Sequence, residues 1–214
     1  MSRMRSAVKF LLPLGAAGAA VAMGRSVLHE RRNPEPFPAA RARMLQSPLV
    51  RRQTAKIAES LDLAPGMRVL DVGAGIGRLS VPVATRVGPQ GEVVALDIQQ
   101  EMLDILDKHA AEAGVTNIRM VRAPAGEGGL EKSAFDRALL VAVLGEIPAD
   151  RRLAALREIR EALKPDGILY VLEGPVDPHY QTRKAVARLS GEAGFKLSGT
   201  RRLGLTCLYV LNNQ

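Results

Sequence analysis

A run of spaced glycines between a strand and a helix constrains this chain more than any other feature. Residues Val69–Ser80 read VLDVGAGIGRLS, so a short apolar strand leads into Gly73, Gly75 and Gly77, and a helical pattern follows. Glycine adopts backbone angles that side chains forbid, and it lets a ligand approach the main chain closely. Such a turn at the start of a helix is typical of a site for a nucleotide-type cofactor.

Strand and helix patterns alternate after Pro65, which predicts a doubly wound α/β domain with a parallel sheet. The predicted strands cover residues 68–72, 92–97, 118–122, 135–140, 168–173, 196–200 and 205–211. The predicted helices cover residues 77–87, 99–113, 150–163 and 180–193. The third helix is expected to begin at a capping Asp150 and to end in the turn Leu163–Gly167.

Composition excludes several classes of protein. Aromatic residues make up 3% of the chain and Trp is absent, so we expect an aliphatic core and no stacking platform for single-stranded nucleic acid. Cys207 is the only cysteine, and we expect it in the core because it has no partner for a disulfide. One cysteine and three scattered histidines also predict no metal site.

The glycine spacing and the residues around it point to one cofactor. A dinucleotide fingerprint needs G-x-G-x-x-G, but Arg78 occupies the place of its last glycine. The pattern D-x-G-x-G-x-G that begins at Asp71 instead resembles class I S-adenosylmethionine-dependent methyltransferases. Later markers stand in the family's order: Ala95–Ile98, Phe135–Asp136 and Leu163–Gly167.

The resemblance extends from Pro65 to Leu211 and is strongest to the small-molecule and lipid-type branch, which includes quinone-biosynthesis C-methyltransferases. It implies a Rossmann-like sheet of seven strands whose last strand is antiparallel. It also implies S-adenosylmethionine as the cofactor, with Asp71 contacting its methionine portion directly or through water.

Asp97 is the second acid that the resemblance assigns to this site. It lies about 20 residues past the loop, where a carboxylate accepts both ribose hydroxyls. A plain N-cap for the next helix is the alternative reading. Relatives often carry an adenine-contacting acid after strand three, but Arg122–Glu127 lacks one there, which leaves backbone groups or Glu127 for that contact. The predicted cofactor-binding residues are Asp71, Gly73, Ala74, Gly75, Gly77, Asp97, Ile98, Met102 and Ala125.

The methyl acceptor is expected at the carboxyl ends of strands four and five. An Asn/Asp-Pro-Pro-Tyr-type motif is missing after strand four, which argues against methylation of a nucleobase or a glutamine amide. The wall Leu140–Leu144 is aliphatic, and Glu146 follows it either as a site acid or as an exposed turn residue.

Strand five ends in the densest polar group of this edge. His179 beside a carboxylate is a candidate base for a hydroxyl or an acidic carbon, with Tyr180 orienting the acceptor. In the alternative reading Asp177 caps the next helix and His179 points to water. The candidate catalytic residues are Glu146, Glu173, Asp177, His179 and Tyr180.

The N-terminal region is apolar and basic. Residues 1–60 hold 11 Lys and Arg against three acids, which accounts for the net charge of +8. The uncharged run Phe10–Gly24 covers roughly 22 Å as a helix, against about 30 Å of bilayer core, and Lys9 and Arg25 at its ends can snorkel. We expect residues 1–32 to be a membrane anchor that leaves the domain on the cytoplasmic face. A cleaved signal peptide and a packed helix are the alternatives.

Residues 33–61 join this region to the domain, which covers residues 62–214. Asn33–Pro38 is a proline-rich linker, and Ala39–Leu61 carries a helical pattern broken at Pro48. These helices either cap the substrate pocket or simply pack on the sheet.

The predicted function is therefore methyl transfer from S-adenosylmethionine to a small, fairly apolar acceptor, such as a lipid, a quinone or an isoprenoid-like compound, at a membrane surface. The alternatives are an RNA or protein methyltransferase that uses the basic arm, and a non-catalytic protein that binds the cofactor. Nucleic acid is not the expected partner, and the pattern favours no oligomeric state.

Overall fold

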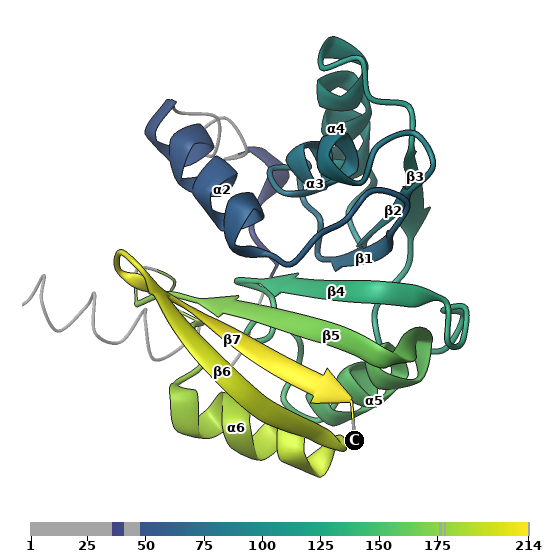
Figure 1. The fold of residues 1–214 in the computed structure, drawn as a ribbon. Helices are drawn as coiled ribbons and strands as arrows, with labels where there is room; N and C mark the ends of the chain where they lie inside the picture. The colour runs from purple at the N-terminus through teal and green to yellow at the C-terminus, as the bar shows by residue number, and fades with distance from the viewer. Residues whose placement is uncertain (1–35, 41–47, 176, 178, 214) are drawn as a thin grey trace, which may run out of the picture.

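The computed structural model describes residues 36–40, 48–175, 177 and 179–213 (Figure 1). The helices are α2 (Pro48–Ser60), α3 (Ser80–Val87), α4 (Gln100–Glu112), α5 (Arg152–Ala162) and α6 (Arg183–Glu192). The strands are β1 (Arg68–Val72), β2 (Glu92–Asp97), β3 (Ile118–Arg122), β4 (Phe135–Val141), β5 (Leu163–Glu173), β6 (Phe195–Leu203) and β7 (Thr206–Asn213).

The seven strands form one sheet in the order β3-β2-β1-β4-β5-β7-β6. The first five are parallel, and β7 is antiparallel to both β5 and β6, so the predicted Rossmann-like sheet is confirmed. The strand order reverses between β1 and β4. In parallel sheets, loops on either side of such a reversal leave a crevice at the carboxyl ends of the strands, where ligands bind.

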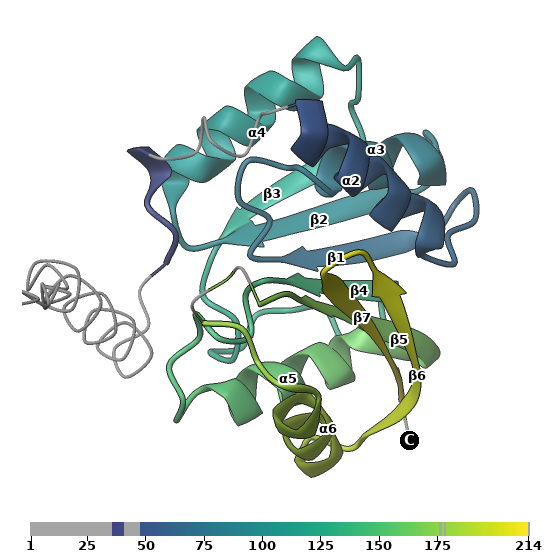
Figure 2. The same cartoon turned by 90° about the vertical axis from the view of Figure 1, so that its left-hand side faces the viewer.

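Helices cover both faces of the sheet, which explains why its strands are almost continuously apolar. Helices α2, α3 and α4 lie on one face, and α5 and α6 lie on the other (Figures 1 and 2). Leu156 of α5 belongs to the same core cluster as Val171 of β5. On the opposite face, Ile57 of α2 and Val83 of α3 cluster with Tyr170, the residue before Val171.

Several predicted boundaries differ from the structure, among them the starts of α3, α5, α6 and β5 and the end of β6, and the structure gives a reason for two of them. Strand β5 begins at Leu163, because Leu163 already pairs with Phe135 of β4. The next paired residues are Arg137 and Ile168, so residues 164–167 form an irregularity between the two pairs. Helix α5 begins at Arg152, and its N-cap is Arg151 without a side-chain cap bond. Asp150 is therefore not the cap, since a turn onto the Pro148 carbonyl already delivers the chain into the helix.

None of the helices in the described part of the chain has the length and apolarity that a bilayer crossing needs. The apolar run predicted as an anchor, within residues 1–32, lies outside the described residues.

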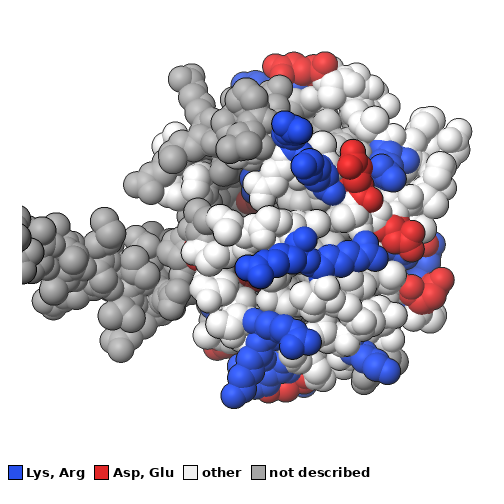
Figure 3. Space-filling view, turned by 60° about the vertical axis from the view of Figure 1, so that its left-hand side comes forward, with Lys and Arg blue, Asp and Glu red and all other residues white. Residues whose placement is uncertain are grey.

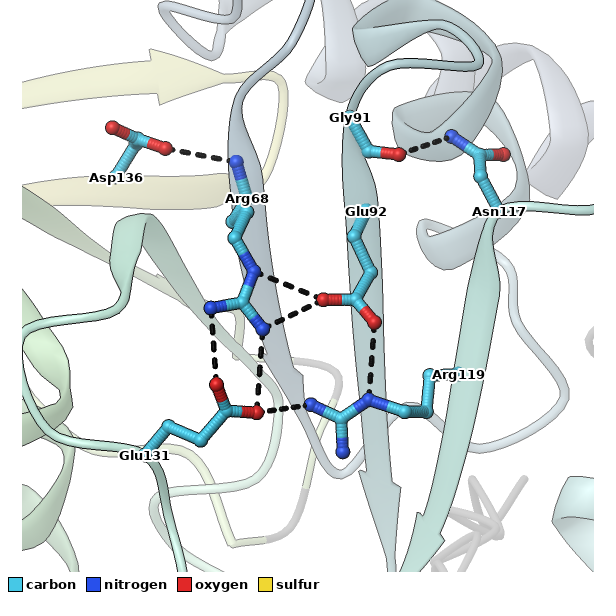
Figure 4. Close-up of polar contacts among 7 residues, drawn as sticks. All are labelled: Arg68, Gly91, Glu92, Asn117, Arg119, Glu131 and Asp136. Carbon is cyan, nitrogen blue, oxygen red and sulfur yellow. Dashed lines mark hydrogen bonds and ion pairs between the residues drawn. The ribbon is translucent and has the colours of Figure 1, made fainter.

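Charged side chains at the amino ends of β1 and β2 form a closed ring (Figure 4). Arg68 contacts Glu92 at 2.7 Å and Glu131 at 3.1 Å, while Arg119 contacts the same two carboxylates at 3.0 and 2.5 Å. Exposed pairs contribute little each, but this ring ties the helix-free β3–β4 connection to the sheet. Every charge in the ring has a partner, at the edge opposite the crevice.

The amide of Asn117 joins three turns beside this ring. Its Nδ2 lies 3.0 Å from the Ala84 carbonyl oxygen, 2.7 Å from that of Gly88 and 3.2 Å from that of Gly91. One side chain thus donates hydrogen bonds to carbonyl groups at the end of α3 and in the turn before β2.

We expect Asn117→Ala to lower the free energy of unfolding by about 1–3 kcal/mol, because it removes the hydrogen bonds to three carbonyl groups, of which only those of Ala84 and Gly88 keep a main-chain partner. Urea unfolding followed by circular dichroism measures the change. The matched control is Thr116→Ala at the exposed neighbouring position, which should stay within about 0.5 kcal/mol of the native protein. Equal stability of the two variants would contradict the assigned role.

Candidate cofactor and acceptor site

The glycine loop after β1 requires glycine for two physical reasons. Gly73, Gly75 and Gly77 have φ of 70°, 53° and 77°, in the left-handed region. A Cβ on Gly73 would overlap the Val143 side chain, and one on Gly77 would lie 2.7 Å from Leu106 Cγ. A Cβ on Gly75 would meet nothing within 4 Å. The middle glycine therefore faces open space, where a ligand can reach the main chain.

Asp97 fixes this loop to the end of β2. One carboxylate oxygen accepts the Gly75 N–H at 2.8 Å, and the other accepts the Gln99 N–H at 2.9 Å. The N-cap of α4 is Gln99, so the simple capping interpretation of Asp97 holds only in part. Because each carboxylate oxygen has two lone pairs, Asp97 can accept further hydrogen bonds from a ligand.

Asp71 lies at the end of β1, buried on the face that carries α3. Its carboxylate accepts the Ser80 hydroxyl at 2.6 Å. Burial raises the pKa of Asp71 to about 6, the Ser80 bond opposes this, and the nearby Asp97 charge adds to it. Two acids thus flank the glycine loop, together with the Arg78 guanidinium, whose charge lowers the pKa of Asp71.

The other predicted cofactor residues divide between open and covered positions. Ile98 is 45% exposed beside the loop, whereas Met102 is buried in a cluster with Ile76. Ala125 packs on the core under α5. Glu127 pairs with Arg151 at 2.5 Å, so it is directed to the α5 end of the site.

Phe37 covers the edge of the glycine loop, a role that sequence reasoning missed. Its side chain packs with Ile76 and Met102, and its carbonyl accepts Gln99 Nε2 at 3.0 Å. Its main-chain N–H acts on the Glu146 carboxyl group and lowers its pKa. The described part of the predicted linker therefore bridges the two halves of the site (Figure 2). A large apolar residue among prolines was the available signal.

Helix α2, which belongs to the region predicted to cap the pocket, packs on the sheet. Ile57 and Ala58 of α2 are buried in the core cluster with α3 and the sheet. This half of α2 therefore agrees with the alternative prediction, in which the helix simply packs on the sheet. Residues 41–47 of the same prediction lie outside the described residues.

The acceptor wall after β4 is aliphatic, as predicted. Ala142 has φ of 57°, an uncommon angle for a residue with a side chain, and it places Val143 directly against Gly73. Leu144 is fully buried. The wall thus touches the glycine loop, and a ligand on Gly75 lies beside it.

Three predicted carboxyl groups come together beyond this wall. Glu146 interacts electrostatically with Asp177, and Glu173 interacts with both. Glu173 Oε2 accepts the Gln181 N–H at 2.8 Å, and Asp177 Oδ1 accepts the His179 N–H at 2.7 Å. Asp177 does not cap α6, because Thr182 is the N-cap and its side chain accepts the Ala185 N–H.

The loops that carry these acids interlock. A Cβ on Gly145 would overlap the His179 carbonyl, to which Gln181 Nε2 donates at 2.8 Å. The Arg152 guanidinium donates to the carbonyls of Gly145 and Ile147, both at 2.8 Å. A cavity of about 200 Å³ remains between the loops, lined by Gly145, Arg152, His179, Tyr180 and Gln181. His179 and Tyr180 are thus half-buried at a cavity, and Arg152 and Gln181 join the site without any signal in the sequence.

Residues 69–167 match the family model for a methyltransferase domain. The ubiquinone/menaquinone biosynthesis C-methyltransferase of Coxiella burnetii is 33% identical over 112 residues, which is 52% of this chain and 44% of that protein. The nocamycin O-methyltransferase of Saccharothrix syringae is 34% identical over 126 residues, 58% of this chain and 43% of that protein. The chain therefore spans less than half the length of these curated relatives.

The chain carries a class I S-adenosylmethionine-dependent methyltransferase domain. Its fold agrees with the crystal structure of a S-adenosylmethionine-dependent methyltransferase from Aquifex aeolicus, with a TM-score of 0.73 and 23% identity over 82% of this chain and 97% of that chain. The cofactor of the methyltransferase domain is S-adenosylmethionine, as the glycine pattern predicted.

The residues present fit this cofactor. The space over Gly75 admits a ligand to the main chain, and Asp71 and Asp97 suit its positively charged methionine portion and its ribose hydroxyls. Among the described residues, no group of His, Cys, Asp and Glu could hold a metal ion.

Burial dominates the electrostatics of the acceptor side in the methyltransferase domain. It raises the pKa of Glu146 to about 8, and the charges of Asp177 and Asp97 act in the same direction. Burial also raises the pKa of Glu173 to about 8, against the opposing Gln181 hydrogen bond, and it raises the pKa of Asp177. Near neutral pH this group therefore holds protons that exposed acids would have lost.

The protein should lose stability as pH rises through this range. A carboxyl group whose pKa is higher in the folded state binds more protons when folded, so the free energy of unfolding falls between its two pKa values. For Glu173 this window runs from 4.5 to about 8. We expect Glu173→Gln to unfold at a higher temperature than the native protein at pH 9, and without that advantage at pH 5.

Melting temperatures at several pH values test this expectation. Glu59→Gln, on the exposed face of α2, is the control, and it should follow the native curve. If the native protein and Glu173→Gln show parallel curves from pH 5 to pH 9, Glu173 does not hold its proton in the folded state.

Proposed function

We propose that the methyltransferase domain transfers a methyl group from S-adenosylmethionine to a small, fairly apolar acceptor, such as a lipid, a quinone or an isoprenoid-like compound, at a membrane surface. One observation carries this proposal: the aliphatic wall Leu140–Leu144 lies between the glycine loop and three partly or fully buried carboxyl groups. An apolar acceptor body fits such a wall, and the carboxyl groups suit a nucleophile that must lose a proton.

The cofactor is proposed to lie over the glycine loop. Asp97 would hold the ribose, and Asp71 would face the methionine portion. Ile98 and Met102 would flank the adenine under the cover of Phe37, with the backbone near Ala125 beside it. The full proposed set is Asp71, Gly73, Ala74, Gly75, Gly77, Asp97, Ile98, Met102 and Ala125.

The residues of the chain then have three tasks. Bound S-adenosylmethionine supplies an electrophilic methyl group. Val143 and its neighbours align the acceptor and exclude water, and alignment of this kind contributes several kcal/mol to catalysis. Glu146, Glu173 or Asp177 accepts the proton of the nucleophile, with His179 and Tyr180 beside them. The names of the two relatives support a small-molecule acceptor with a carbon or oxygen nucleophile.

The surface around the crevice supports a membrane as the partner. Exposed basic residues lie on α2, α6 and the edge strand β6: Arg52, Lys56, Arg183, Lys184, Arg201 and Arg202. These elements lie on the side that Figure 3 brings forward, where blue side chains outnumber red ones. Leu205, at the β6–β7 turn, is 67% exposed. Anionic lipid attracts such a face, and an exposed leucine can enter the lipid boundary. With the apolar N-terminal run, this face favours the cytoplasmic side of a membrane.

Asp97→Ala should weaken the binding of S-adenosylmethionine by at least about tenfold, since it removes both the ribose acceptor and the bond to Gly75. Isothermal titration calorimetry on the full chain measures the affinity. Asp107→Ala, on the exposed face of α4, is the matched control and should bind as the native protein does. Native affinity in Asp97→Ala would refute the proposed cofactor site.

The acceptor class can be identified without knowing the acceptor. The full chain is incubated with methyl-labelled S-adenosylmethionine and either washed membranes or the soluble fraction of a cell extract. We expect label in the organic extract of the membranes, and Glu146→Gln should reduce it at least about tenfold if proton removal limits the reaction. The exposed variant Glu101→Gln is the control.

Other distributions of the label would contradict the proposal. Label in RNA or protein would assign the basic face to a macromolecular substrate. Binding of the cofactor with no labelled product in any fraction would favour a non-catalytic protein.

A further inference from the structure

The carboxyl groups of Glu146, Glu173 and Asp177 lie within electrostatic range of one another, and they are called the carboxyl cluster below. Glu173 is only 3% exposed, and its Oε1 has no hydrogen-bond partner among the described residues. An unpaired oxygen of a buried acid costs free energy unless the group is protonated or a ligand approaches it.

The neighbouring charges do not neutralise the cluster. The Arg152 guanidinium acts on Glu173 electrostatically, but it donates its hydrogen bonds to the carbonyls of Gly145 and Ile147. His179 faces Asp177, while Glu146 faces Asp177 and Asp97. Tyr209 and Cys207 lie on the β7 side of Glu173. The surroundings of the cluster are therefore mostly acidic or neutral.

The cluster is next to the cofactor loop. Glu146 lies three residues after Val143, whose side chain contacts the position of a Gly73 Cβ, and it is within electrostatic range of Asp97. Phe37 accepts the Gln99 side chain on one side, and on the other its main-chain N–H lowers the pKa of Glu146. A positive charge held over the loop would thus lie on the Glu146 side of the cluster.

We propose that the carboxyl cluster is the counter-ion of the sulfonium group of S-adenosylmethionine, and that the cluster releases a proton when the donor binds and recovers it when the neutral product S-adenosylhomocysteine is left. A cation in this site lowers the pKa of each neighbouring carboxyl group, because opposite charges at short range favour the ionised form. Removal of the methyl group removes that charge, and the ionised cluster then becomes unfavourable again.

Two consequences follow for the reaction. An ionised carboxylate is present at the acceptor side only while the donor is bound, so a proton acceptor becomes available together with the methyl group. The product also binds less tightly than the donor, because it gains no stabilisation from the cluster. The inference rests on the proposed cofactor position, and it is independent of the acceptor.

Isothermal titration calorimetry of the full chain at pH 7.5 tests the proposal. The donor and the product are each titrated in phosphate and in Tris, whose different ionisation enthalpies reveal the number of protons released. We expect the donor to release roughly half a proton to one proton more than the product does, since each linked group changes its proton content by at most one. We also expect the donor to bind at least about tenfold more tightly.

Two variants assign the proton to the cluster. Glu146→Gln and, independently, Glu173→Gln should each reduce the extra proton release and bring the donor and product affinities together. Glu101→Gln, exposed in the first turn of α4, should keep the native values.

Equal proton release by donor and product in the native protein would overturn the inference while leaving the cofactor site intact. Native proton release in both glutamine variants would overturn it as well, since the proton would come from elsewhere. Absence of donor binding would overturn the inference together with the cofactor site.

Discussion

The close contact between the glycine loop and its neighbours is the constraint on which the rest of the site depends. Val143 occupies the space that a Gly73 side chain would need, and Leu106 does the same at Gly77. The loop therefore packs closely against the aliphatic wall after β4 and against α4, and of its three glycines only Gly75 faces open space. Asp97 holds it there through the Gly75 N–H. For this reason the proposed cofactor position over the loop lies directly beside the aliphatic wall proposed for the acceptor.

Charged side chains are paired at the amino edge of the sheet, whereas at the carboxyl edge a buried acid lacks a full set of partners among the described residues. At the amino edge, Arg68, Glu92, Arg119 and Glu131 neutralise one another in partly exposed positions (Figure 4). At the carboxyl edge, Glu173 is buried with an unpaired oxygen. A buried acid without a cation destabilises a protein, and sites that act on ligands commonly tolerate such strain. The contrast supports the proposal that the chemistry occurs at the carboxyl edge.

The carboxyl cluster also lies beside the proposed positions of the cofactor and the acceptor. In the proposed site, a sulfonium ion would add a positive charge beside the carboxyl cluster, and the aliphatic wall would keep water away from the donor and the acceptor. An acceptor with an apolar body and one acidic proton would complete the site. Phe37 lies at the same boundary, because its carbonyl accepts Gln99 and its main-chain N–H lowers the pKa of Glu146.

The sequence by itself determined the order of the elements, the glycine loop and the acids at the strand ends, because these depend on local apolar patterns and on backbone angles that only glycine adopts readily. It also indicated the family. Only the tertiary structure decided which acids meet. Glu146 and Glu173 are far apart in the chain, and they come together because β4 and β5 are neighbouring parallel strands that end at one edge. Local patterns carry no information on the bridge from Phe37, the Arg152 contacts or the turn that replaced the Asp150 cap. Those depend on which loops pack together, and packing is settled across the whole fold.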